Sequence, residues 1–512
     1  MTTFDEQLAR GYGFGEPALV LGAALHEGVA HHPPHVRIPL AMLNRHGLVA
    51  GATGTGKTRT LQLLAEQCAA AGIPVFAADV KGDLAGLARP GTASPRIEER
   101  AGGVGLPWTP AGAPVEFVSL TGRLGVQLRA TVSSFGPLLL AKVLGLNDTQ
   151  TGVLTLVFRY ADERGLPLLD FADLRTLLRF LGSAEGRAEL EATGGASRQT
   201  LGVLLRRMVE LEAQGAEQFF GEPEFDVRDL LHVTQEGQGT VTCLELADVQ
   251  DRPRLYSTFL MWLLAELYQT LPEAGDLDRP KLVFFFDEAH LLFDDAPKAF
   301  LEQVEQVVRL VRSKGVGVFF VTQTPKDVPA SVLGQLGHRV QHALRAHTPE
   351  DDAAIRATVR TFPKTTFYDL DETLTSLGIG EAVVTALDPR GVPTPVVATR
   401  LMAPASRMGP LTPEEFQAEL AGSDLMAEYG AAVDRESAHE MLARRMERAG
   451  EGDRGTGTGE REAPRGRAAK SAAAVAVGAL AGAIGRTVGR EVIRGMFGLL
   501  GAKPPRATRR GR

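Results

Sequence analysis

The chain has 512 residues, 44% of them hydrophobic, and a formal net charge of −7, which is enough for roughly two to four domains with buried cores. Cys68 and Cys243 lie in apolar stretches without a CxxC partner. This argues against a disulfide framework or a zinc site and is typical of a reducing compartment. Residues 1–30 hold no apolar core of signal-peptide length, so we expect a cytoplasmic protein.

The charge is unevenly distributed. Residues 465–512 carry eleven Lys and Arg side chains against Glu491 alone, so the rest of the chain is acidic. An acidic body does not exclude nucleic-acid binding, but it requires that any track for phosphates be local, such as the lining of a pore.

The N-terminal residues 1–46 contain two predicted strands, at 18–21 and 36–39, and are too short for an independent domain. We interpret this segment as an N-terminal flap. A cluster of three histidines in this segment, His31, His32 and His35, has no carboxylate or cysteine at ligand spacing, which favours a solvated loop over a metal site.

Residues 51–58, GATGTGKT, fill every fixed position of the P-loop pattern GxxxxGK[ST]. An apolar strand at 48–50 precedes them and a predicted helix at 61–71 follows, as nucleotide binding requires. The glycines allow the backbone N–H groups to curl around a phosphate, and the helix N-terminus adds its positive dipole end. Lys57 would reach the β- and γ-phosphates, and the Thr58 hydroxyl would bind Mg²⁺. The predicted ATP-binding residues are Gly51, Thr53, Gly54, Thr55, Gly56, Lys57, Thr58 and Arg59.

Further strands and helices follow in a predicted α/β order. A buried strand at 73–79 ends in the charged sequence DVKGDL, where open α/β sheets place ligand-facing groups. Residues 90–239 interrupt this order with a mostly helical insertion that includes one strand at 115–120. Residues 240–405 then resume it, with strands at 240–246, 281–287, 316–322 and 339–344 and a hairpin at 380–400. We therefore predict a RecA-like P-loop core of mainly parallel sheet, formed by residues 47–89 and 240–405.

The strand at 281–287 supplies the second half of a hydrolytic site. Its apolar run ends in the adjacent carboxylates Asp287 and Glu288, which is the Walker B pattern. We expect Asp287 to hold the Mg²⁺ shell and Glu288 to orient the attacking water, which makes the chain a hydrolase. Gln323, at the end of the next strand, is placed to sense the γ-phosphate.

The composition changes after about residue 405. Residues 406–449 are predicted to form exposed helices, 450–467 a disordered linker, and 468–512 a Gly/Ala-rich basic helix and tail. Gly478, Gly482, Gly485 and Gly489 fall on one helical face and allow close helix contact. This tail could serve self-association, packing or contact with a membrane surface.

Four motifs in order resemble the HerA/FtsK superfamily of P-loop ATPases: GATGTGKT at 51–58, DVKGDL at 79–84, LVFFFDEAH at 282–290 and VTQTP at 321–325. The sequences RSKGVGVFFVTQTP and VLGQLGHRVQHALRA resemble more closely its bacterial HerA-like (YjgR-like) branch. The resemblance implies a homo-oligomer, usually a hexameric ring, in which an arginine finger completes the neighbour's site. Arg339 is then the candidate finger, with Arg345 and Arg312 as alternatives.

The chain also departs from better known members, because it shows neither a preceding β-barrel nor a DNA-reading winged helix. DNA as a partner is implied by the resemblance alone. The expected function is a Mg²⁺-dependent ATP hydrolase, a ring-forming DNA translocase or helicase-like motor. The alternative is a non-translocating ATPase switch or scaffold that acts on a protein or membrane partner through the tail.

Overall fold

The computed structural model describes residues 3–191, 194–293, 298–345 and 348–454. These form two compact units. The first contains residues up to 129, 214–219 and 223–432. The second contains 130–213, 220–222 and the chain from 433 onward. The predicted tail at 468–512 and most of the predicted linker lie outside the described residues.

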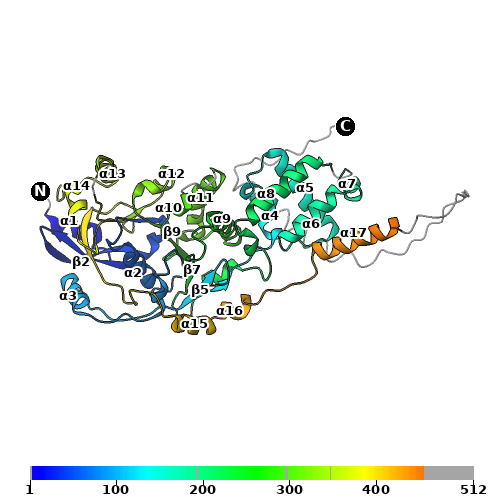
Figure 1. The fold of residues 1–512 in the computed structure, drawn as a ribbon. Coiled ribbons are helices and arrows are strands. Elements are labelled where there is room, and N and C mark those ends of the chain that lie inside the picture. Colours follow the sequence, from blue (N-terminus) through cyan, green and yellow to red (C-terminus); the bar gives the residue numbers. More distant parts are fainter. Residues whose placement is uncertain (1–2, 192–193, 294–297, 346–347, 455–512) are drawn as a thin grey trace, which may run out of the picture. The chain divides into compact units, whose positions relative to one another are not determined.

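The first unit is built on one sheet with helices around it (Figure 1). Among the described residues this sheet has twelve strands, in the order β2-β1-β12-β11-β10-β3-β9-β8-β4-β7-β5-β6. The run from β10 to β6 is parallel, whereas β11, β12, β1 and β2 are antiparallel. The sheet therefore confirms the predicted α/β class with a mainly parallel core. The strands are β1 (Ala18–His26), β2 (Val29–Pro39), β3 (Gly47–Ala50), β4 (Val75–Asp79), β5 (Val115–Ser119), β6 (Val126–Gln127), β7 (Val241–Glu245), β8 (Leu282–Phe286), β9 (Val316–Thr322), β10 (His338–His342), β11 (Glu381–Thr385) and β12 (Val397–Leu401).

Helices cover both faces of the parallel part of the sheet. The central strands are continuous apolar runs, and every residue of β8 and β9 is buried, as expected for strands covered on both sides. Phe285 belongs to one core cluster with Leu61 and Leu64 of α2. On the opposite face Phe76 packs against Phe259 of α9, with ring centroids 6.5 Å apart.

The helices of this unit are α1 (Phe4–Tyr12), α2 (Lys57–Ala70), α3 (Pro95–Val104), α9 (Pro253–Thr270), α10 (His290–Phe293), α11 (Lys298–Val311), α12 (Ala330–Leu333), α13 (Pro349–Val359), α14 (Leu370–Ser376), α15 (Pro413–Ala421) and α16 (Asp424–Tyr429). Helices α15 and α16 fall in the range predicted as exposed, yet they bury Leu420, Leu425 and Tyr429. The burial of these apolar side chains depends on tertiary contacts, which the local sequence could not indicate.

The N-terminal segment belongs to the sheet instead of standing apart from it. Strand β1 pairs with β12 and β2, and so extends the core by two strands. The histidines predicted to lie in a solvated loop are in strand β2 instead, because β2 begins at Val29 and pairs with β1. His31 Nδ1 lies 2.8 Å from Asp5 Oδ1, and the rings of His32 and His35 are stacked.

The second unit is helical and draws on two distant parts of the chain. It contains α4 (Val132–Val143), α5 (Asp148–Arg164), α6 (Phe171–Gly182), α7 (Ala184–Glu191), α8 (Arg198–Glu212) and α17 (Ala438–Arg454). This unit includes fewer residues of the range 90–239 than the predicted insertion, since α3, β5 and β6 belong to the first unit. It also recruits α17, which packs on α6 and includes residues 450–454 of the predicted linker. Among the described helices, none combines the length and apolar character needed to cross a bilayer.

Candidate active site

The P-loop connects β3 to α2 at the carboxyl edge of the parallel strands. Gly51, Gly54 and Gly56 have φ values of 154°, 78° and 115°, in the region that favours glycine. A Cβ atom on Gly51 would lie 2.5 Å from the Cβ of His342, so any larger residue would displace β10. A backbone hydrogen bond from a distant segment also stabilises the loop, since Gly380 N donates to the Thr55 carbonyl at 3.0 Å.

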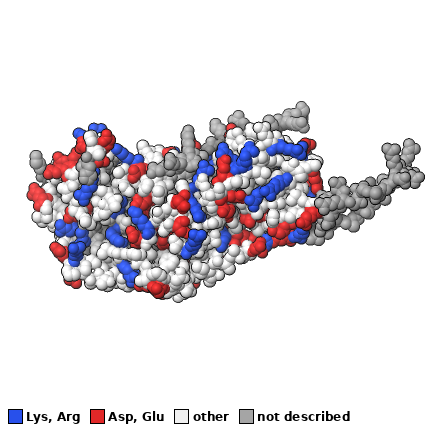
Figure 2. All heavy atoms as spheres, viewed as in Figure 1, with Lys and Arg blue, Asp and Glu red and all other residues white. Residues whose placement is uncertain are grey.

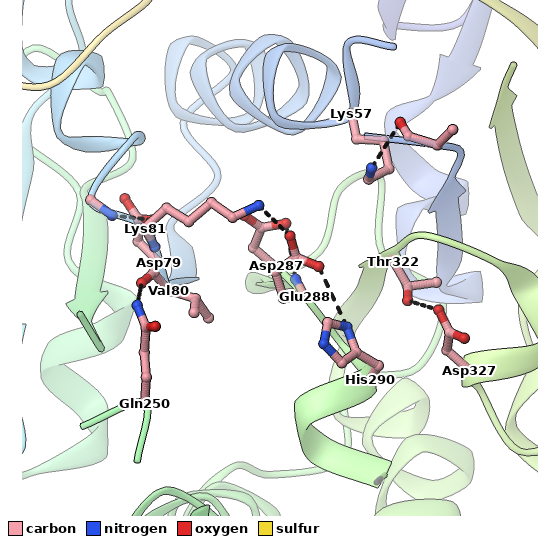
Figure 3. Close-up of polar contacts among 12 residues, drawn as sticks. Lys57, Asp79, Val80, Lys81, Gln250, Asp287, Glu288, His290, Thr322 and Asp327 are labelled. Atoms are coloured by element: carbon pink, nitrogen blue, oxygen red, sulfur yellow. Dashed lines mark hydrogen bonds and ion pairs between the residues drawn. The ribbon is translucent and has the colours of Figure 1, made fainter. Parts of the chain in front are cut away.

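Lys57 is the first residue of α2 and is 8% exposed. Its Nζ donates to the carbonyl oxygen of Ala52, 3.2 Å away in the same loop (Figure 3). Burial lowers the pKa of Lys57, and the charges of Glu288 and Asp287 partly offset this effect. The ammonium therefore points into the loop that would surround a phosphate and contacts only a neutral oxygen there, which suits an incoming anion.

Asp287 and Glu288 follow β8 directly and are 4% and 6% exposed. Glu288 N donates to Asp287 Oδ1 at 2.9 Å, whereas Asp287 Oδ2 and Glu288 Oε2 are buried without a hydrogen-bond partner among the described residues. Burial, and then the charge of Glu288, raises the pKa of Asp287 to about 7. Two adjacent buried carboxylates with free oxygens fit a divalent cation, which would compensate their charge.

The strand order brings these two motifs to one edge of the sheet. Strand β9 lies between β3 and β8, and all three are parallel. The carboxyl ends that carry the P-loop and the acidic pair therefore face the same side. The residues present thus fit ATP at Lys57 and the loop amides, with Mg²⁺ at Asp287. The roles of Lys57, Thr58 and Asp287 stay predictions.

Gln323 comes directly after β9 and is exposed. Its carbonyl oxygen accepts a hydrogen bond from Gly51 N at 3.2 Å, so the structure places this residue beside the P-loop. Its role as a sensor stays a prediction.

Arg339 lies at the amino ends of the parallel strands, whereas the P-loop of its own chain lies at their carboxyl ends. It is near the amino end of β10, in register with Leu48. Its guanidinium donates to the carbonyls of Thr361 (3.1 Å) and Leu333 (3.5 Å). Arg312 also precedes a parallel strand, β9, at that end, whereas the exposed Arg345 follows β10 at the P-loop edge. The identity of the finger stays a prediction.

The structure adds two residues that the sequence did not single out. The ammonium of Lys81, two residues beyond β4, pairs with Glu288 Oε1, and His290 Nδ1 lies 3.4 Å from Glu288 Oε2. Figure 3 shows Lys81 reaching from the end of β4 to Glu288, and His290 approaching the same carboxylate from α10. The charged sequence DVKGDL could have indicated a functional role for Lys81. The partner of Lys81, Glu288, could not be predicted in this way because the pairing depends on the strand order.

Cys243 lies in a second buried acidic cluster. Its Sγ and the carboxylates of Asp79 and Glu245 offer atoms within 4.8 Å of one another. Burial and the charge of Asp79 raise the pKa of Glu245 to about 8. Asp79 already accepts three backbone N–H groups, from Lys81, Gly82 and Leu84, so its carboxylate shapes the loop after β4.

A strand, P-loop and helix with an Asp-Glu pair on a nearby parallel strand define a P-loop ATPase. The family model described as "Helicase HerA-like C-terminal" matches residues 26–505. The chain therefore belongs to this HerA-like family.

Solved structures of similar proteins include the plasmid coupling protein TrwB in complex with the non-hydrolysable ATP analogue ADPNP. It is 16% identical, with a TM-score of 0.48, over 78% of this chain and 99% of that one. VirB4 of Thermoanaerobacter pseudethanolicus is 16% identical, with a TM-score of 0.47, over 80% of this chain and 100% of that one. A comparison with curated protein sequences gives no match.

Proposed function

We propose that this protein hydrolyses ATP with Mg²⁺ and, as a ring of identical subunits, uses the reaction to move along DNA. The convergence of Lys57, Asp287 and Glu288 at one edge of the sheet carries the proposal. Together they supply a cation for the β- and γ-phosphates, a ligand for the metal, and a carboxylate for the water.

Each residue then has a defined task. Lys57 turns from the Ala52 carbonyl to the phosphates, because a charge-assisted bond is stronger than one to a neutral oxygen. Thr58 and Asp287 would hold Mg²⁺, which would neutralise phosphate charge. Glu288 orients water through Oε2, which accepts no hydrogen bond from the residues that the structure describes and lies 3.4 Å from His290 Nδ1. Gln323 lies beside Gly51 and would contact the γ-phosphate.

Membership of the HerA-like family supports the DNA-motor part of the proposal. The surface is consistent with a local phosphate track, since Figure 2 shows Lys and Arg interspersed with Asp and Glu on the visible face. A motor of this kind would need assembly, because an arginine from one subunit completes the neighbour's site.

The test measures steady-state ATP hydrolysis against added double-stranded DNA at low and moderate salt, with Lys57→Ala as the blank. Phosphate contacts weaken steeply with salt. We therefore expect stimulation of several fold that decreases as salt rises. Hydrolysis that does not respond to DNA in either salt would overturn the motor and support a switch or scaffold with a protein or membrane partner. A wild-type rate equal to the blank would overturn hydrolysis itself.

A further inference from the structure

Lys81 stands in a loop that is anchored on several sides. The Asp79 carboxylate accepts the N–H groups of Lys81 (3.0 Å), Gly82 (2.8 Å) and Leu84 (2.7 Å). From another loop, Gln250 Nε2 donates to the Val80 carbonyl at 2.6 Å. The backbone that carries Lys81 is thereby fixed relative to the end of β4.

Sheet register sets this loop opposite the acidic pair. Strands β4 and β8 are parallel neighbours, with Ala78 in register with Phe286. The residues that follow each strand therefore emerge side by side, and Lys81 reaches Glu288 although 207 residues separate them. The lysine side chain is 49% exposed and that of Glu288 is 8% exposed, so the ammonium enters the site from its solvent side.

The contact distinguishes the two oxygens of Glu288. Oε1 pairs with Lys81, whereas Oε2 accepts no hydrogen bond from the described residues, with His290 Nδ1 at 3.4 Å. The Glu288 backbone is in the left-handed region, with φ of 46°, which is unusual for a residue other than glycine and is found at functional sites. The second lysine of the site, Lys57, donates to the Ala52 carbonyl of its own loop at 3.2 Å.

We propose that Lys81 is a positioning residue that holds Glu288 through Oε1 and so leaves Oε2 directed at the attacking water. The ammonium fixes the carboxylate in one orientation, which limits the geometries that the water can adopt. Lys57 acts on the phosphates, and Lys81 acts on the group that orients the water. This inference rests on the proposed ATP hydrolysis.

The role predicts a defect in turnover and not in binding. Lys81 pairs with Glu288, and among the described residues no hydrogen bond or ion pair joins it to the P-loop. Lys81→Met should therefore lower kcat for ATP about 10- to 100-fold, with KM changed by less than about twofold. Lys81→Arg, which keeps the cation, should recover part of the rate. Combining Lys81→Met with Glu288→Gln should be no slower than Glu288→Gln alone, because residues that act as a unit are not additive.

The experiment uses the full chain and steady-state phosphate release, with Lys364→Met as the matched control. Lys364 is an exposed lysine of the same unit and lies outside the site. Binding of a fluorescent ATP analogue to each variant reports whether the site is folded.

A Lys81→Met rate equal to wild type overturns the inference. A faster rate also overturns it, because Lys81 would then restrain Glu288. If Lys81→Met and Lys81→Arg both lose analogue binding, Lys81 is needed for the fold of the site and the positioning role fails. All these outcomes presuppose wild-type hydrolysis above the Lys57→Ala blank, so they are distinct from failure of the proposed function.

Discussion

The backbone N–H of His439 donates a 2.8 Å hydrogen bond to the carboxylate of Asp173, across 266 residues of sequence. Asp173 is fully buried, and its other oxygen accepts the N–H groups of Leu169 (2.7 Å) and Asp170 (3.1 Å). The Asp173 carboxylate therefore caps the N-terminus of α6 and also binds the backbone at the N-terminus of α17. This contact ties the C-terminal helix to the inserted helices in one unit.

Replacing Asp173 tests that connection. Asp173→Ala would remove the acceptor of three N–H donors, of which only that of Leu169 is in a buried hydrogen bond. A buried donor without a partner costs about 1 to 3 kcal/mol, so we expect the helical unit to lose about 1 to 3 kcal/mol of unfolding free energy, measured by urea unfolding together with proteolysis of α17. Asp434→Ala, at an exposed position of the same unit, is the matched control. Equal stability of the two variants would contradict the assignment.

Glu288→Gln tests the water-orienting role. The amide keeps the size of the side chain but cannot act as a base, so hydrolysis should fall by about 100-fold or more. Binding of ATP should persist, because Lys57 and the P-loop are unchanged. Phosphate release and binding of a fluorescent ATP analogue measure the two effects separately. Wild-type turnover by this variant would show that another group orients the water.

The arginine finger can be tested at two positions. Arg339 donates to the carbonyls of Thr361 and Leu333 of its own chain, whereas Arg345 is exposed at the P-loop edge. A finger must reach the phosphates of a neighbouring subunit, so the geometry favours Arg345. We expect Arg345→Ala to lower kcat of assembled rings by about 10³-fold, and Arg339→Ala mainly to lower thermal stability. The reverse pattern would return the role to Arg339.

Stability should decrease with acidification because of buried neutral histidines. His338 is 1% exposed, its Nε2 lies 2.7 Å from the Met42 carbonyl, and its Nδ1 accepts Leu387 N at 3.4 Å. Burial lowers the pKa of His338 to about 4, below the ordinary 6.5. The unfolded chain therefore binds the proton first, and stability present above pH 6.5 is lost as the pH falls toward 4.

Between pH 7 and pH 5 the contribution of His338 to this loss is about 2 kcal/mol. The measurement compares unfolding free energies of wild type and His338→Gln at both values. The variant is expected to be less stable at pH 7 but to lose less on acidification. Identical pH dependence of the two proteins would show that His338 does not titrate as its surroundings indicate.

The sequence by itself determined the two local motifs of the candidate site. Glycine spacing at 51–58 and the apolar run that ends at Asp287 are local patterns, because a tight phosphate-binding turn and a doubly covered strand each constrain only neighbouring residues. The parallel strands were predictable for the same reason, and β3, β4, β7, β8, β9 and β10 appear where the pattern indicates.

Only the tertiary structure decided which distant residues meet. The pairing of Lys81 with Glu288 requires β4 and β8 to be neighbours in one register. The contact of Asp173 with His439 requires the chain to return to the helical unit after the whole core. Periodicity and turn chemistry specify single elements, whereas strand order and helix docking arise from the burial of all the apolar faces together.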